Sequence, residues 1–544
     1  MTTPNQSPDT PTAAPKVAAD SMSWRLLEVV LFTLAATWAA WYYTLAEFRV
    51  TYWGFPLDDA WIHLQFARNL ATGHGFSYNP GIPVAGSTAP LWTLVLAVPA
   101  VLGLSPVPSA KLIGLALTIV SAWLASALTV QLTRSRTAAL LAGLAIALGP
   151  RYAWGSLSGM EVSLYTALAL WTLLAYLRAL HSGSPVWGLL AGLAGAARPE
   201  VFVLFPILAI DWTVRGVAGR LPRRGLACWA GPMAGFLLPA GAFVAVNMWG
   251  SGHPLPLTFY AKSYGMGTLP SLMEGRWHDA WMDARLYPHR FVYLLAGFCE
   301  TEYPDLAFGA GVGALTLLGL IRNGTQQRGG YVLVAMLLLA PVLKGLAAPQ
   351  PWFLVHEGRY LLHLLAIFVV VSAVGLAEIQ RWLNRSWVLP IFAAIAIARL
   401  VGMLQFEAPW YASKVKNIND LQIGTAQWLL AETSPDARIA TNDIGAIAYF
   451  GHRFIIDTEG LVTPEAIHPK RMRQFVPFLE SVHPDLLVIF PEWYPEIASR
   501  TDLFHEVYRI HAKQTAAGST HLVVYRTPWS RPEAAPRFLK APAP

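Results

Sequence analysis

The chain carries more long apolar runs than a soluble fold can bury. A transmembrane helix needs roughly 17–25 mostly apolar residues, and runs of this kind recur from Trp24 to about residue 405. Hydrophobic residues form 55% of the sequence and the mean hydropathy is +0.43, which is typical of a polytopic membrane protein. The expected spans lie near 24–46, 109–132, 137–150, 161–180, 184–199, 200–214, 225–249, 303–321, 330–348, 360–377 and 386–405.

The positions of the arginines predict how often the chain crosses. If the run at 89–104 does not cross and the N-terminus lies inside, the basic loops all lie in the cytoplasm, as membrane proteins prefer. These loops contain Arg134, Arg136, Arg178, Arg215, Arg220, Arg223, Arg224, Arg322, Arg328, Arg381 and Arg385. A crossing at 89–104 would place them outside. We therefore expect about eleven spans, with 89–104 as a juxtamembrane or re-entrant helix.

Three regions follow from this topology. Residues 1–22 are rich in Pro, Thr, Ala and Ser and are expected to form a disordered cytoplasmic tail. Residues 23–408 form the transmembrane domain, with outer loops at 48–88 and 250–302. Residues 409–544 alternate helical and short apolar segments, which predicts an extracytoplasmic α/β domain. Its expected strands lie at 437–441, 454–458, 485–490, 505–510 and 521–527, and its helices at 418–432 and 471–482.

Several function classes are disfavoured. The net charge is +7, but the cations belong to loops beside the membrane and form no basic stripe with interleaved aromatics, so nucleic acid is not an expected partner. The sequence has no GxxxxGK[ST] loop, no GxGxxG after a strand, no HExxH and no CxxC pair. Nucleotide hydrolysis and a cytosolic nucleotide-sugar donor are therefore not expected.

Two adjacent aspartates, Asp58 and Asp59, follow the first span. Carboxylates beside a bilayer are costly, which makes this pair a candidate catalytic site. One can take a proton from an attacking hydroxyl, and one can hold a divalent cation such as Mg or Mn. Capping of the helix that begins AWIHLQFARNL explains one of the two, but not both.

Other polar residues are predicted on the same outer face. His63 shares a helix face with the aspartates. It is either a metal ligand or a hydrogen-bond donor to a phosphate, or else a histidine at the membrane interface. Glu161 begins a span, either as a second catalytic carboxylate and cation ligand beside Asp59, or as a helix-dipole partner. Arg198, in Arg198-Pro199-Glu200, either belongs to a structural turn or orients a lipid phosphate.

Cations just above the hydrocarbon suit a lipid-linked phosphate. Lys262 lies in the second outer loop, and His356 and Arg359 lie where the chain enters a later span. The alternative is contact with lipid headgroups. Trp277 and Trp281, four residues apart, indicate an amphipathic surface helix, or alternatively a wall for a sugar.

The region DDAWIHLQFARNLATGHGFSYNPGIPVAGSTAPLW, residues 58–92, resembles the first outer loop of the GT-C superfamily of membrane glycosyltransferases. It is most similar to the bacterial group that includes the mycobacterial terminal arabinofuranosyltransferase. Further similar motifs are SGMEVSLY, AARPE, GHPLPLTFYAKS, EGRYLLHLL and NDIGAIAYFG. One departure, Ile82-Pro83-Val84-Ala85-Gly86-Ser87 in place of Arg and an acidic or Thr residue, leaves the donor sugar open.

This resemblance implies a GT-C type fold in a bacterial plasma membrane, with the site and the C-terminal domain extracytoplasmic. It implies inverting transfer of a sugar from a polyprenyl-phosphate donor to an acceptor hydroxyl on a glycan, lipid or protein. Asp58 and Asp59 become the base and its companion, and Lys262 and Arg359 stabilise the leaving phosphate. Alternatives are a transporter or flippase of lipid-linked sugars, a phosphoethanolamine- or acyl-type transferase, and a sugar-binding sensor.

Overall fold

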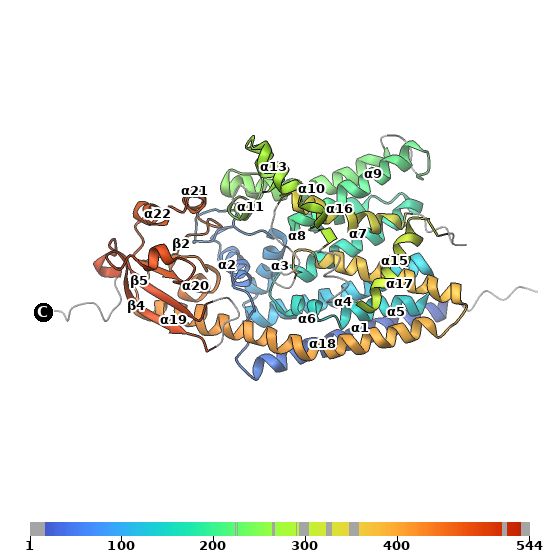
Figure 1. Cartoon of the computed structure of the whole chain (residues 1–544), viewed down its shortest axis with the longest axis horizontal. Coiled ribbons are helices and arrows are strands. Elements are labelled where there is room, and N and C mark those ends of the chain that lie inside the picture. Colours follow the sequence, from blue (N-terminus) through green and yellow to red (C-terminus); the bar gives the residue numbers. More distant parts are fainter. Residues whose placement is uncertain are drawn as a thin grey trace, which may run out of the picture.

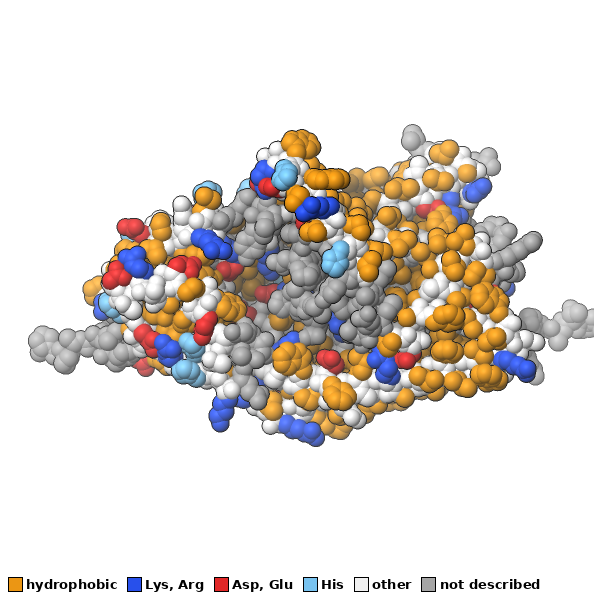
Figure 2. Space-filling model, viewed as in Figure 1, with side chains coloured by type: hydrophobic (Ala, Val, Ile, Leu, Met, Phe, Trp, Pro, Cys, Tyr) orange, Lys and Arg blue, Asp and Glu red, His pale blue; other side chains and the backbone are white. Residues whose placement is uncertain are grey.

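The computed structural model describes residues 17–222, 225, 227–263, 267–289, 291–292, 304–321, 329–347, 358–513 and 519–534. A bundle of helices occupies one end of an elongated molecule, and a small domain with a sheet occupies the other (Figure 1). Hydrophobic side chains cover much of the visible surface of the bundle, whereas charged side chains gather over the small domain (Figure 2). This distribution agrees with a membrane-embedded bundle and a domain in water.

Six helices among the described residues are long and apolar enough to cross a membrane. They are α1 (Val17–Phe48), α4 (Pro106–Thr133), α7 (Val162–Ser182), α10 (Ala227–Ser251), α17 (Leu362–Leu383) and α18 (Val388–Ile418). Shorter helices that match other predicted spans are α5 (Arg136–Ala147), α8 (Val186–Ala197), α9 (Leu204–Val217), α15 (Pro304–Leu317) and α16 (Tyr331–Ala347). The chain is a multi-pass membrane protein, and the count of eleven spans stays a prediction.

Helix α1 begins at Val17, six residues inside the segment predicted to be a disordered tail. The physical reason is helix propagation: adding a residue to an existing helix costs far less than starting one, so the Ala-containing stretch before the span continues it. Residues 1–16 lie outside the described residues.

The run expected not to cross forms α3 (Pro90–Val101), which is only 12 residues long. At about 1.5 Å per residue α3 is shorter than a hydrocarbon core of roughly 30 Å, but α5 and α8 are equally short, so its length does not decide whether it crosses. Lys111 Nζ, near the start of α4, lies 2.7 Å from Glu47 Oε2, near the end of α1. The chain between them therefore leaves and re-enters the bundle at the same end, which agrees with a juxtamembrane α3.

Short helices fill the space between the bundle and the small domain. The helix that carries the predicted site is α2 (Asp59–Ala71), and it packs against α3. The others in the described loops are α6 (Pro150–Leu157), η1 (Pro199–Val203), α11 (Leu257–Ser263), α12 (Thr268–Met273) and α13 (Trp277–Ala284). Trp277 and Trp281 of α13 are 72% and 69% exposed, as a surface helix requires.

The C-terminal domain contains a five-stranded sheet of order β2-β1-β3-β5-β4. Its strands are β1 (Arg438–Thr441), β2 (Phe454–Asp457), β3 (Leu486–Ile489), β4 (His505–His511) and β5 (His521–Arg526). Strands β2, β1 and β3 are parallel, while β5 and β4 add antiparallel partners at one edge. The strands coincide with those predicted from the sequence, because each is a short apolar run bounded by turn residues.

Alternating side chains give the sheet two buried faces. Ala440 and Leu487 pack on one face against helix α22 (Phe475–Val482). Ile439 and Val488 pack on the other, in a cluster that contains Ile62. The remaining helices are η4 (Asn419–Ile423), α19 (Gly424–Glu432), α20 (Gly445–Gly451), η5 (Pro464–Ala466), α21 (Ile467–Arg471), α23 (Pro495–Ala498) and η6 (Pro532–Ala534).

The small domain is therefore joined to the membrane part in two ways. Helix α2 contributes Ile62 and Phe66, one helical turn apart, to the domain's own core. Helix α18 continues through the π-helical η4 into α19 without a break, so one long helix runs from the bundle into the domain (Figure 1). This arrangement places the start of α2 at the junction of the two parts.

Candidate active site

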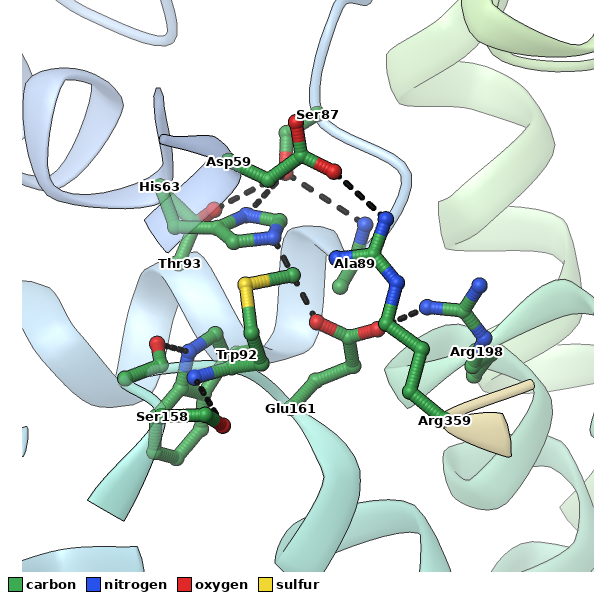
Figure 3. A network of polar contacts seen from close by, with 12 residues as sticks. Asp59, His63, Ser87, Ala89, Trp92, Thr93, Ser158, Glu161, Arg198 and Arg359 are labelled. Carbon is green, nitrogen blue, oxygen red and sulfur yellow. Dashed lines mark hydrogen bonds and ion pairs between the residues drawn. The ribbon is translucent and has the colours of Figure 1, made fainter. Parts of the chain in front are cut away.

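Asp59 and Arg359 form an ion pair at the start of α2. Arg359 Nη2 donates to Asp59 Oδ2 at 2.5 Å, and the two side chains face each other in Figure 3. Arg359 lies in the turn before α17 and is 2% exposed, whereas the Asp59 side chain is 32% exposed. Within the described part of the chain, Arg359 Nε and Nη1 have no hydrogen-bond partner. Two buried guanidinium nitrogens, with three N–H bonds between them, are therefore available to donate to an anion.

A second set of contacts begins one helical turn further along α2. His63 Nε2 lies 3.4 Å from Glu161 Oε2, and its Nδ1 lies 3.2 Å from the Ser87 hydroxyl (Figure 3). Arg198 donates to Glu161, whose side chain is fully buried at the start of α7. Burial lowers the pKa of His63 to about 3; the Asp59 charge opposes this shift, and the positive charges of Arg359, Arg198 and Lys262 add to it. The ring is therefore neutral at physiological pH. It can donate one hydrogen bond and accept another, but it carries no positive charge.

Tyr360 connects the two arginines. The guanidinium carbon of Arg198 lies 4.4 Å from the centre of its ring, and that of Arg359 lies 5.2 Å away. Burial opposes ionisation of this phenol, but the charges of Arg359, Lys262 and Arg198 bring its pKa down to about 7. Such a shift requires a strongly positive local potential, and the same potential attracts an anionic group such as a phosphate.

Asp58 points away from this cluster toward the C-terminal domain. Its carboxylate accepts the backbone N–H of Gly445 at 2.6 Å and that of Ala446 at 2.8 Å, at the start of α20. Burial raises its pKa well above the usual range, and the neighbouring charge of Asp443 adds to the rise. The two adjacent aspartates thus have different surroundings: Asp59 meets the arginines, and Asp58 holds the C-terminal domain.

The remaining predicted residues are placed as follows. Lys262, in α11, is partly exposed and close enough for its charge to act on His63 and Tyr360. Arg198 Nε lies 3.2 Å from Glu200 Oε2, so the Arg198-Pro199-Glu200 turn carries an ion pair of its own. His356 lies outside the described residues.

The expected divalent cation does not fit these side chains. Asp59 faces Arg359 and Glu161 faces Arg198, so a guanidinium already lies where a cation would approach each carboxylate. Among the described residues, no group of three or more His, Cys, Asp and Glu is arranged to hold a metal ion. Asp59 and Glu161 are therefore brought into one cluster but not into one ligand set.

Sequence reasoning missed several members of this site. Tyr360 follows Arg359 directly, and its aromatic ring next to a buried cation was a usable signal. Ser87 donates to or accepts from Thr93 at 3.0 Å behind His63, and neither hydroxyl stood out in the sequence. Asp443, which is near Asp58, lies 385 positions away along the chain, so no local pattern linked them.

The cluster suits chemistry at an anionic group. Two arginines and one lysine lie close enough together for their charges to act on Tyr360, and a partly exposed carboxylate, Asp59, pairs with one of the arginines. Cations so placed stabilise negative charge that develops on a leaving phosphate, and a carboxylate accepts a proton from a nucleophile.

Comparisons with known protein families, curated proteins and solved structures show which fold this chain has. A family described as a domain of unknown function (DUF8728) matches residues 415–528. No match was found among curated proteins. The Archaeoglobus fulgidus oligosaccharyltransferase in its apo form has a TM-score of 0.55 and 12% identity, covering 94% of this chain and 76% of that one.

Two further structures are similar over most of this chain, at 15% identity and TM-scores of 0.49. The alignment with ArnT from Cupriavidus metallidurans bound to undecaprenyl phosphate covers 91% of this chain and 97% of the ArnT chain. The arabinofuranosyltransferase AftD from Mycobacteria covers 91% of this chain, which corresponds to 40% of AftD. The oligosaccharyltransferase match, together with the helical bundle and the C-terminal sheet domain, identifies the fold: the chain has the fold of the GT-C membrane glycosyltransferases.

Proposed function

We propose that this protein is an inverting glycosyltransferase that uses a polyprenyl-phosphate sugar as donor. The observation that carries the proposal is Arg359, a buried arginine with two guanidinium nitrogens that have no partner within the described residues and that lie beside the Asp59 carboxylate. Buried donors without partners are rare in proteins, and a bound anion would satisfy these two nitrogens. A planar guanidinium matches a phosphate oxygen pair better than any other side chain.

The reaction follows from this geometry. The donor phosphate binds Arg359, with Lys262 and Arg198 adding positive charge. It competes with Asp59 for the guanidinium, because both are anions, and so frees the carboxylate. Asp59 takes the proton of the acceptor hydroxyl, whose oxygen forms a bond to the anomeric carbon. The bond from that carbon to the phosphate oxygen breaks, and polyprenyl phosphate leaves with the electron pair on the opposite side of the sugar, which inverts the anomeric centre.

Asp59 is the better candidate for the base. Both oxygens of Asp58 accept backbone N–H groups from α20, so Asp58 is fixed by the C-terminal domain. Glu161 is fully buried and paired with Arg198, which makes it a positioning residue for His63 and Arg198. No step of the proposed reaction uses a metal ion.

We further propose that the site faces the extracytoplasmic side of a bacterial plasma membrane. The arginine-rich loops support this orientation: Arg381 Nη2 donates to the Thr133 carbonyl at 2.5 Å, beside the basic turn at Arg134. These loops belong to the ends of α4 and α17 remote from Glu47, Lys111 and Arg359, and basic loops favour the cytoplasm. The site then lies on the opposite face, where lipid-linked sugars are used.

Purified protein offered a panel of polyprenyl-phosphate monosaccharides tests the proposal. We expect transfer by the wild type, loss of at least about 100-fold in Asp59→Asn because a general base contributes roughly 10²–10⁴, and a smaller loss in Asp58→Asn. Equal activity in wild type and Asp59→Asn would remove this carboxylate from the chemistry. Movement of intact donor across vesicles without cleavage would favour the transporter alternative.

A further inference from the structure

Asp443 lies at the edge of the C-terminal sheet that faces the membrane part. It follows β1, at the carboxyl end of the three parallel strands β2, β1 and β3. The chain passes from β1 to β2 on one side and then returns to β3 on the other side. In open α/β sheets, ligands bind outside the carboxyl ends of the strands at such a point of reversal.

The same edge is joined to the start of α2. Asp58 accepts the N–H groups of Gly445 and Ala446, two and three residues after Asp443. The contact is so close that a Cβ on Gly445 would lie 2.1 Å from the Asp58 carbonyl oxygen. Asp443 therefore lies at the junction, where its charge acts on Asp58 and that of Asp59 acts on it, and all three residues are partly exposed. Asp59 is the member that also contacts Arg359.

Two buried amides hold Asp443. Gln422 Nε2 donates to Asp443 Oδ2 at 2.7 Å, and Asn442 Nδ2 donates to Asp443 Oδ1 at 3.4 Å. Gln422 is fully buried and Asn442 is 6% exposed. In the part of the chain that the structure describes, Gln422 Oε1 and Asn442 Oδ1 have no hydrogen-bond partner. Because each oxygen shares its amide group with a nitrogen that donates to Asp443, both acceptors lie near this carboxylate.

The position of Gln422 has a local structural cause. It belongs to η4, the π-helical turn within the long helix that enters the C-terminal domain. A π-helical turn is uncommon, and such turns occur frequently at functional sites. Here it places a fully buried polar side chain beside a carboxylate, an arrangement that sheet packing alone does not require.

The chemistry of the cluster selects its ligand. A carboxylate and two amide oxygens without partners form a set of acceptors, and such a set binds a molecule with several closely spaced O–H donors. Adjacent hydroxyls of a sugar ring supply several such donors close together, whereas an acyl chain supplies none.

We propose that Asp443, with the amides of Gln422 and Asn442, binds the hydroxyl groups of a carbohydrate acceptor next to Asp59. This inference rests on the proposed glycosyltransferase function and adds the acceptor class and the part of the chain that holds it. The membrane part then binds the donor through Arg359, the C-terminal domain binds the acceptor, and Asp59 lies between them.

The test uses the full-length protein, an active polyprenyl-phosphate sugar, and tagged oligosaccharides, peptides and a diacylglycerol as acceptors. Two readouts are needed: donor cleavage by water and transfer to the acceptor. We expect transfer to oligosaccharides, with Asp443→Asn and Gln422→Met raising the acceptor KM by about tenfold or more, as lost hydrogen bonds to a charged group imply. Donor KM and cleavage by water should stay unchanged.

Asp436→Asn is the matched control, since Asp436 lies exposed just before the other end of β1 and should retain the wild-type acceptor KM. An unchanged acceptor KM in both Asp443→Asn and Gln422→Met would overturn the inference, as would transfer only to peptides or the diacylglycerol. Retained donor cleavage in the two variants would show that they are folded. Absence of both cleavage and transfer in the wild type would instead refute the glycosyltransferase function itself.

Discussion

Replacing Arg359 by lysine tests the anion site while keeping its charge. Arg359 Nη2 donates to Asp59, whereas Nε and Nη1 have no partner among the described residues. The donor phosphate is proposed to displace Asp59 and to accept from Nη2 together with Nε or Nη1, the pairs of nitrogens that share an edge of the guanidinium. A lysine ammonium reaches one phosphate oxygen where the guanidinium fork reaches two, so one charge-assisted hydrogen bond is lost. Such a bond contributes about 1.5–3 kcal/mol, which corresponds to a fall of about 10- to 150-fold in kcat/KM.

Initial rates at varied donor and fixed saturating acceptor measure this effect. Arg399→Lys is the matched control, because Arg399 Nε contacts Asp305 Oδ2 at 2.7 Å in a comparable arginine–aspartate pair outside the cluster. We expect Arg399→Lys to keep the wild-type kcat/KM. Wild-type kcat/KM in Arg359→Lys, or an equal fall in both variants, would refute the role of Arg359 as the phosphate-binding residue.

Three further predictions concern the C-terminal domain. Gly445→Ala should weaken its attachment by about 1–3 kcal/mol, the usual cost of overpacking, because the added Cβ meets the Asp58 carbonyl oxygen at 2.1 Å. Thermal unfolding and limited proteolysis should detect this, whereas Gly451→Ala in the same helix, with its nearest neighbour at 3.6 Å, should resemble wild type. Burial raises the pKa of Asp443 to about 6. The Gln422 hydrogen bond opposes this rise, and the charges of Asp59 and Glu459 add to it. Transfer at limiting acceptor should therefore fall below about pH 6 in wild type and lose this limb in Asp443→Asn. Stability should change in the opposite sense: folded pKa values of about 6 for Asp443 and about 7 for Asp457 exceed the ordinary 3.8, so stability decreases as pH rises through them. Unfolding measured from pH 4 to pH 8 that shows rising stability would contradict this sign.

The fold was largely predictable because it depends on local patterns. Apolar runs near 109–132 and 360–377 predict α4 and α17, since a helix must bury its backbone hydrogen-bonding groups in lipid. Short apolar segments between turn residues predict the strands of the C-terminal sheet. The arginine pattern predicted that α3 does not cross, in agreement with the contact between Lys111 and Glu47.

The sequence by itself determined the membrane architecture, the α/β domain and the candidates Asp59, His63, Glu161, Arg198 and Arg359, because unusual polar residues beside apolar runs are visible without a structure. Only the tertiary structure decided how two adjacent aspartates divide their roles. Successive residues on a helix point about 100° apart, so Asp59 meets Arg359 while Asp58 meets α20. Both partners lie 300 or more positions away. Contacts of that separation are set by how the bundle and the C-terminal domain pack, which no local pattern of residues encodes.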